Sequence, residues 1–113
     1  MENTVNKVEL QGYVGISPEH INFKNGNSIL KFSLATNESY KDKNGEWQKQ
    51  TTWHKIFMMN GNAEKASKEI CRGNRVNITG KIVNKSYMNK EGKKVYTTEI
   101  FALNFALVEK KVE

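Results

Sequence analysis

The chain has 113 residues, of which 37% are hydrophobic and 27% charged, which favours one globular domain and excludes a disordered chain. No apolar run reaches the length of a membrane span, and no secretory signal pattern opens the sequence, so we expect a cytoplasmic protein. The single cysteine, Cys71, fits a reducing compartment, and with two histidines it gives no metal-ligand cluster, so we expect no metal and no cofactor.

The first part of the chain predicts two strands and two loops. Residues 5–14 alternate between apolar and polar side chains, which indicates a strand with one buried face. Residues 17–27 form a loop around an Asn-Gly turn signal, and residues 29–36 alternate again. Residues 37–49 are polar and predict a long hairpin loop that projects from the body. Two aromatic residues stand on either side of its Asn-Gly turn, Tyr40 and Trp47.

Residues 50–59 predict a strand whose two faces differ. His54, Ile56 and Met58 share one face and suit a core. A cation alternating with aromatic and soft apolar groups would instead suit stacking on nucleic-acid bases while holding phosphate. The alternative is a strand buried on both sides, with its lysine extending to solvent. The residues of this second face are Trp53, Lys55, Phe57 and Met59.

The second half of the chain predicts one helix and two strands. Apolar residues recur at helical spacing within residues 61–73, which indicates a short amphipathic helix. Residues 75–87 form a strand, residues 88–94 a basic loop that turns at Glu91-Gly92, and residues 95–108 the last strand. The face of 75–87 opposite its aliphatic residues again combines an aromatic group with lysines: Lys81, Lys85 and Tyr87.

Positive charge is concentrated in residues 65–94. This segment holds nine basic and two acidic residues, a net charge of +7, within a chain of net charge +6. Such a concentration indicates a polyanionic partner. The alternative is a solvated basic surface that aids solubility.

The predicted order is therefore three strands, one helix and two strands. This order is typical of a mainly β fold, a five-stranded OB-fold barrel with one short helix between strands 3 and 4. We expect a single domain over residues 1–113, with its core within about residues 5–108. Barrels of this kind commonly bind single-stranded nucleic acid or oligosaccharide on one face.

Several segments also carry a resemblance to a known family: 6–15 (NKVELQGYVG), 18–19 (PE), 32–40 (FSLATNESY), 50–55 (QTTWHK), 76–81 (VNITGK) and 96–99 (YTTE). In these segments the chain resembles bacterial single-stranded DNA-binding proteins of the OB-fold type. The resemblance implies a nucleoid-associated protein that binds single-stranded DNA with little sequence preference, and that coats and protects it during replication, recombination and repair.

The resemblance further implies which side chains stack on bases. Trp53 matches a family tryptophan, Tyr40 and Tyr87 stand where better-known members have tryptophan, and Met59 stands where they have phenylalanine. Tyrosine offers less stacking area than tryptophan, and methionine offers only a soft apolar contact. With the additional loop tryptophan and the strand pattern above, the predicted stacking residues are Trp53, Tyr40, Tyr87, Trp47, Met59 and Phe57.

Basic side chains on strands and loops are predicted to contact phosphates. Two of them, Arg72 and Arg75, flank the helix end and rank below the lysines. The resemblance implies a homotetramer, with a dimer as the alternative, and places His54 at a subunit interface. The predicted phosphate-binding residues are Lys31, Lys55, Lys81, Lys85, Lys41, Lys43, Lys49, Lys90, Lys93, Lys94, Arg72 and Arg75.

Other functions remain as alternatives. A dimeric replication-restart accessory protein of the same fold would bind single strands and a helicase, and a protein-interaction module would dock a peptide on the aromatic face. An enzyme would need clustered carboxylates, but the sequence has one aspartate, Asp42, and scattered glutamates, so we expect no enzyme. Residues 109–113 carry mixed charge, so we expect no acidic tail of the kind with which family members recruit replication proteins.

Overall fold

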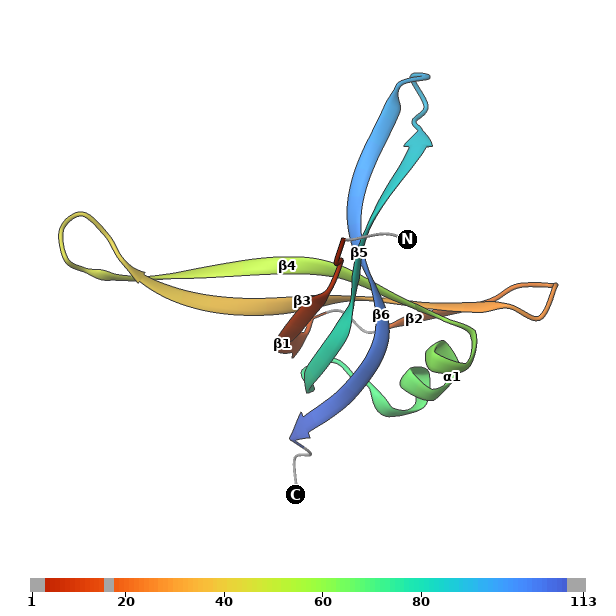
Figure 1. Cartoon of the computed structure of the whole chain (residues 1–113), viewed down its shortest axis with the longest axis horizontal. Coiled ribbons are helices and arrows are strands. Elements are labelled where there is room, and N and C mark those ends of the chain that lie inside the picture. The colour runs from red at the N-terminus through yellow and green to blue at the C-terminus, as the bar shows by residue number, and fades with distance from the viewer. Residues whose placement is uncertain (1–3, 16–17, 110–113) are drawn as a thin grey trace.

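The structure, a computed structural model, describes residues 4–15 and 18–109. They form β1 (Val8–Val14), β2 (Glu19–Asn22), β3 (Ser28–Lys41), β4 (Trp47–Met59), α1 (Asn60–Glu69), β5 (Arg75–Met88) and β6 (Lys94–Glu109). The strands neighbour one another in the order β1-β5-β6-β4-β3-β2, and β1 also pairs with β3. Five strands therefore close into a barrel, and β2 forms a short hairpin with β3 outside the closure (Figure 1).

The predicted mainly β barrel with one helix is confirmed, but the position of the helix in the strand order is wrong. Residues 19–22, predicted as loop, pair with Ser28–Lys31 as β2, so α1 follows the fourth strand and not the third. A strand of four residues gives almost no periodic signal, and its backbone groups are satisfied by the first residues of β3. The helix also ends at Glu69, earlier than predicted.

Alternating residues from all five barrel strands form the core. Their partners on the other face of each strand point outward, because side chains alternate along a strand. Ala63 and Ala66 of α1, with Ile70 just after it, are buried against this core, and the helix contacts β3 and β4. The buried strand residues include Val14, Leu30, Phe32, Leu34, Ile56, Met58, Val76, Ile78, Ile100 and Ala102.

Three hairpins extend from the barrel in different directions (Figure 1). We call them the β2–β3 arm (residues 19–31), the β3–β4 arm (residues 37–51) and the β5–β6 arm (residues 84–98). The β3–β4 arm corrects the predicted loop at 37–49, because strand pairing continues to Lys41 opposite Trp47. The expectation of no acidic tail concerns residues 109–113, of which 110–113 lie outside the described residues.

The same five-residue turn closes each arm. In each turn the N–H of the first residue donates to the carbonyl of the fifth at 2.7–2.9 Å. The fourth residue is a glycine with φ between +78° and +89°, a left-handed conformation that costs glycine little. The three turns span residues 23–27, 42–46 and 89–93, so the glycine turn signals in the sequence are confirmed.

Side chains at the first position reinforce two of these turns. Asp42 Oδ1 accepts the backbone N–H groups of Asn44 and Glu46 at 2.9 Å, and Oδ2 accepts the amide of Gln48 at 3.1 Å. The bonds from Glu46 and Gln48 hold the pKa of Asp42 below its usual value. Asn89 Oδ1 accepts the equivalent N–H groups of its own turn at 2.9 Å, without a titratable group.

Candidate nucleic-acid interface

One surface of the barrel carries the outward side chains of β4, β5 and β6. On β4, Ile56 and Met58 are buried in the core, whereas Trp53 is 59% exposed and Lys55 is exposed. Neighbouring strands bring their own outward residues alongside, because the pairings align equivalent positions. We call this surface the outer face, and it comprises Trp53, Lys55, Phe57, Lys81, Lys85 and Phe101.

The far edge of the Trp53 indole lies against Gly15, the residue that follows β1. A Cβ built on Gly15 would come within 2.6 Å of Trp53 Cη2 and 3.1 Å of Ser33 Oγ, so only a glycine leaves room for the indole there. Opposite Trp53 on β3 is Ala35, another small residue. The indole is thus held against the barrel while much of its surface stays open to a base.

Phe57, a predicted stacking residue, is only 4% exposed. Its ring stacks on Phe101 of β6 with centroids 5.0 Å apart and planes 8° apart, and Lys85 Nζ lies 3.7 Å from its centroid. The ring is therefore on the predicted face but covered. Met59, at the end of the same strand, is 38% exposed.

The other predicted stacking residues lie on the arms. Trp47 shares a face of the β3–β4 arm with Trp53, six residues along β4, and Lys41 Nζ lies 5.6 Å from the centroid of its ring. Tyr40 pairs with Gln48 on the opposite face of this arm, so it does not lie beside the two tryptophans. Tyr87 is exposed on the β5–β6 arm and continues the row of Lys81 and Lys85.

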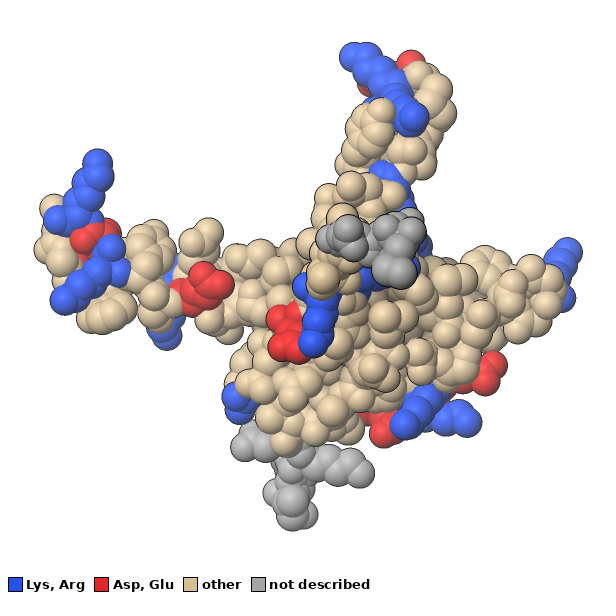
Figure 2. All heavy atoms as spheres, viewed as in Figure 1, with Lys and Arg blue, Asp and Glu red and all other residues tan. Residues whose placement is uncertain are grey.

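Most predicted phosphate-binding lysines fall into two groups. On the barrel and at the bases of the arms, Lys31 and Lys55 line one hollow, with Glu19 and Glu99 in the same lining, and Lys81 and Lys85 lie over the aromatic pair. The remaining lysines lie on the arms, and Figure 2 shows basic side chains gathered at the arm tips. These arm lysines are Lys41, Lys43, Lys49, Lys90, Lys93 and Lys94.

The two predicted arginines lie away from the outer face. Arg75 begins β5, far along the strand from Lys85, and its Nη2 donates to Gln11 Oε1 of β1 at 2.7 Å. Arg72 is exposed in the turn after α1. The structure therefore does not bring them together with the other predicted phosphate contacts.

Comparison with known proteins now identifies the family. The family model described as "Single-strand binding protein family" matches residues 5–108. Single-stranded DNA-binding protein 1 of Chlorobaculum tepidum is 36% identical over 112 residues, which cover 98% of this chain and 69% of the relative. The chain belongs to the single-strand binding protein family.

Solved structures of similar proteins agree with this assignment. A Plasmodium falciparum SSB in complex with ssDNA superposes with a TM-score of 0.87 at 28% identity, over 96% of this chain and 99% of the other. A deletion mutant of the single-stranded DNA-binding protein from Thermus aquaticus gives a TM-score of 0.82 at 20% identity, over 93% and 51% of the two chains. The second similarity shows the shared fold. The resemblance read from the sequence segments is confirmed.

His54 occupies a distinct position in this family member. Its side chain is half-buried on the core side of β4, and Nε2 lies 3.0 Å from Thr36 Oγ1. It also lines a mainly apolar hollow formed by Val8, Leu10, Trp53, His54, Lys55, Ile82, Thr98 and Ile100. A hollow of this composition suits contact with another apolar surface, and His54 remains a predicted interface residue.

Sequence reasoning missed Phe101 of the outer face and Glu99, which pairs with Lys85 beside it. The end of the last strand is apolar at most positions, so its sequence does not separate an inward from an outward face. Alternation from buried Ile100 would have placed Phe101 and Glu99 outward. When a strand is apolar on both faces, apolar and polar residues no longer alternate, so the sequence does not show which face is buried.

The structure also bears on catalysis and on membranes. Within residues 4–15 and 18–109 no group of three or more His, Cys, Asp or Glu side chains is arranged to hold a metal ion. Membership in a family of DNA-binding proteins is consistent with a binding role. In the described part of the chain, α1 is too short and too polar to span a membrane.

Proposed function

We propose that this protein coats single-stranded DNA through its outer face and arms, and protects the strand during replication, recombination and repair. Binding of single-stranded DNA follows from its family. The observation that supports this route is Trp53, an exposed indole on the same face of β4 as Lys55. It works as a binding protein and not as an enzyme.

Base stacking and phosphate contacts both contribute to DNA binding, through different side chains. Bases stack on Trp53 and on the arm aromatics Trp47, Tyr87 and Tyr40, and a good base–aromatic contact contributes about 1–3 kcal/mol. Lysines bind phosphates and release counterions, so affinity falls as salt rises. Because every base presents a π-face, this arrangement gives little sequence preference.

A fluorescence titration with oligo-dT tests this route. Trp47→Phe leaves Trp53 as the one tryptophan, and we expect its emission to be quenched on binding, with affinity falling from low to high salt. Trp53→Ala in the otherwise unchanged chain should weaken binding roughly 10- to 100-fold, the value of one lost stacking contact. Absence of both quenching and binding at low salt would contradict the proposal.

We also propose that the working form is a homotetramer at the nucleoid. The apolar hollow beside His54 supports an additional protein contact, since exposed apolar hollows commonly mark interfaces. The net charge of +6 supports residence on a polyanion.

A further inference from the structure

The aromatic pair Phe57–Phe101 is unusual for its place on the barrel. Both side chains point outward from neighbouring strands, and neither belongs to the core cluster. One face of each phenyl ring lies against the other ring, so the remaining face of Phe57 is an apolar platform of the kind on which bases stack.

Lys85 covers this platform. Its ammonium lies 3.7 Å from the centroid of Phe57, the position that a stacked base would take, and Lys81 Nζ lies 5.8 Å from that of Phe101. A cation over an aromatic face is attracted to it, but a flat base can replace the cation when another anion binds the lysine.

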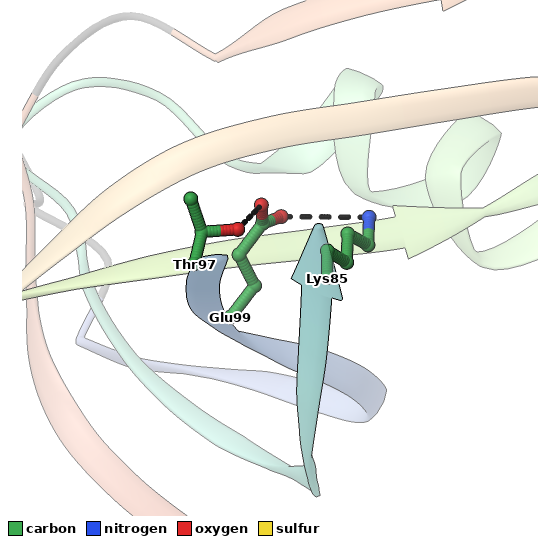
Figure 3. A network of polar contacts seen from close by, with 3 residues as sticks. All are labelled: Lys85, Thr97 and Glu99. Atoms are coloured by element: carbon green, nitrogen blue, oxygen red, sulfur yellow. Dashed lines mark hydrogen bonds and ion pairs between the residues drawn. The ribbon is translucent and has the colours of Figure 1, made fainter. Parts of the chain in front are cut away.

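Glu99 holds Lys85 in this position (Figure 3). Its Oε1 lies 3.5 Å from Lys85 Nζ, and its Oε2 accepts a hydrogen bond from the Thr97 hydroxyl at 3.2 Å. The Glu99 side chain is only 17% exposed, whereas that of Lys85 is 38% exposed. The lysine can therefore be reached from solvent, while the carboxylate is fixed.

The Glu99 carboxylate also lies where bound single-stranded DNA would place its phosphates. Glu99 lines the hollow that contains Lys31 and Lys55. A phosphate and a carboxylate offer an ammonium the same kind of charge-assisted hydrogen bond. Glu99 thus competes with nucleic-acid phosphate for Lys85.

We propose that Phe57 and Phe101 form an additional base-stacking site that is closed in the free protein by Lys85 and Glu99. This rests on the proposed binding of single-stranded DNA to the outer face. A phosphate draws Lys85 away from Glu99, the Phe57 ring is uncovered, and the adjoining base stacks on it. Glu99 sets the affinity by opposing this exchange.

Glu99→Gln tests the proposal, because glutamine keeps the shape and the oxygen that Thr97 needs. The variant should bind oligo-dT about three- to tenfold more tightly at low salt, with a log–log salt dependence steeper by roughly 0.7 for the one freed lysine. Glu9→Gln is the matched control, since Glu9 pairs with Lys7 at 3.1 Å on β1 and both are exposed. If Glu99→Gln gains no more affinity than Glu9→Gln, the proposal is wrong.

A second comparison tests the stacking itself. We expect the gain of Glu99→Gln to be larger on oligo-dT than on an abasic strand of equal length, and to shrink when Phe57→Leu is added. An equal gain on both strands would leave only a phosphate contact and would overturn the stacking site. Failure of the unchanged protein to bind oligo-dT would instead contradict the proposed function.

Discussion

At the scale of single residues, the positions of the aromatic rings depend on what lies beneath them. Trp53 is open to a base because Gly15 and Ala35 are small, whereas Phe57 is closed because Phe101 and Lys85 lie against it. Both are aromatic residues on the same face of one strand. The sequence predicts that shared face, but the difference in exposure depends on neighbours from other strands.

Gly15→Ala should lift the Trp53 indole without disturbing the barrel. No left-handed backbone angle is required at Gly15, and the new Cβ would meet mainly the far end of a side chain. We expect a shifted Trp53 emission in the Trp47→Phe background and an affinity for oligo-dT lowered by about 3- to 30-fold, part of one stacking contact.

Gly61→Ala is the matched control for this substitution. A Cβ at Gly61 meets nothing within 4 Å, and the residue lies in α1, so alanine should raise stability by about 0.5–1 kcal/mol. DNA affinity should not change. Equal DNA affinity in the two glycine variants would show that Gly15 does not position Trp53.

At the scale of elements, turns were more predictable than short strands. The glycine signals at the three arm tips correspond to real turns, because each needs a residue with positive φ. The β3–β4 arm and the first strand of the β2–β3 arm were predicted as loops, since polar residues on both faces hide the strand period, whereas most of the β5–β6 arm was predicted as strand. Their pairing depends on cross-strand hydrogen bonds that the composition of 37–49 does not reveal.

Acid should open the tip of the β3–β4 arm before that of the β5–β6 arm. The pKa of Asp42 is lowered in the fold from an ordinary value of 3.8. Its stabilising contribution is therefore complete above pH 3.8 and is lost as pH falls through the folded-state pKa. We expect the protection factors of the Asn44 and Glu46 amides, each measured against the intrinsic exchange rate at the same pH, to fall at low pH, while those of the turn at Asn89 stay unchanged.

Asp42→Asn provides the control for this acid effect. Asparagine keeps Oδ1 as acceptor for both backbone N–H groups, as Asn89 does in the other arm. The variant's turn should stay closed over the same pH range. Simultaneous opening of both arm tips in the unchanged protein would contradict a role for Asp42 and point to global unfolding.

At the scale of the whole molecule, the arms make the chain more extended than a compact domain. Its Cα radius of gyration is 16.6 Å, whereas a compact chain of this length has about 13 Å. Two-stranded hairpins bury little surface and are only marginally stable in isolation. The sequence predicted one projecting hairpin, at residues 37–49, but not the extended shape that the three arms give together.

The proposed homotetramer predicts a mass four times the chain's 13.0 kDa in light scattering after size exclusion. His54→Ala should shift the mass downward, because the side chain lines the apolar hollow. Thr36→Val removes the His54 hydrogen-bond partner and serves as a control for that bond. A mass of one or two chains in the unchanged protein would contradict the tetramer.

The shared arm turn has a consequence for turnover. Each tip carries an exposed lysine at the second turn position, Lys24, Lys43 or Lys90. Exposed loop tips are preferred sites of proteolytic nicking, and trypsin-like proteases cleave after lysine. Single-stranded DNA lying along an arm would bury that lysine. The DNA would thus shield the protein from proteolysis while the protein covers the DNA. Copies of the protein that are not bound to single-stranded DNA would then be degraded first.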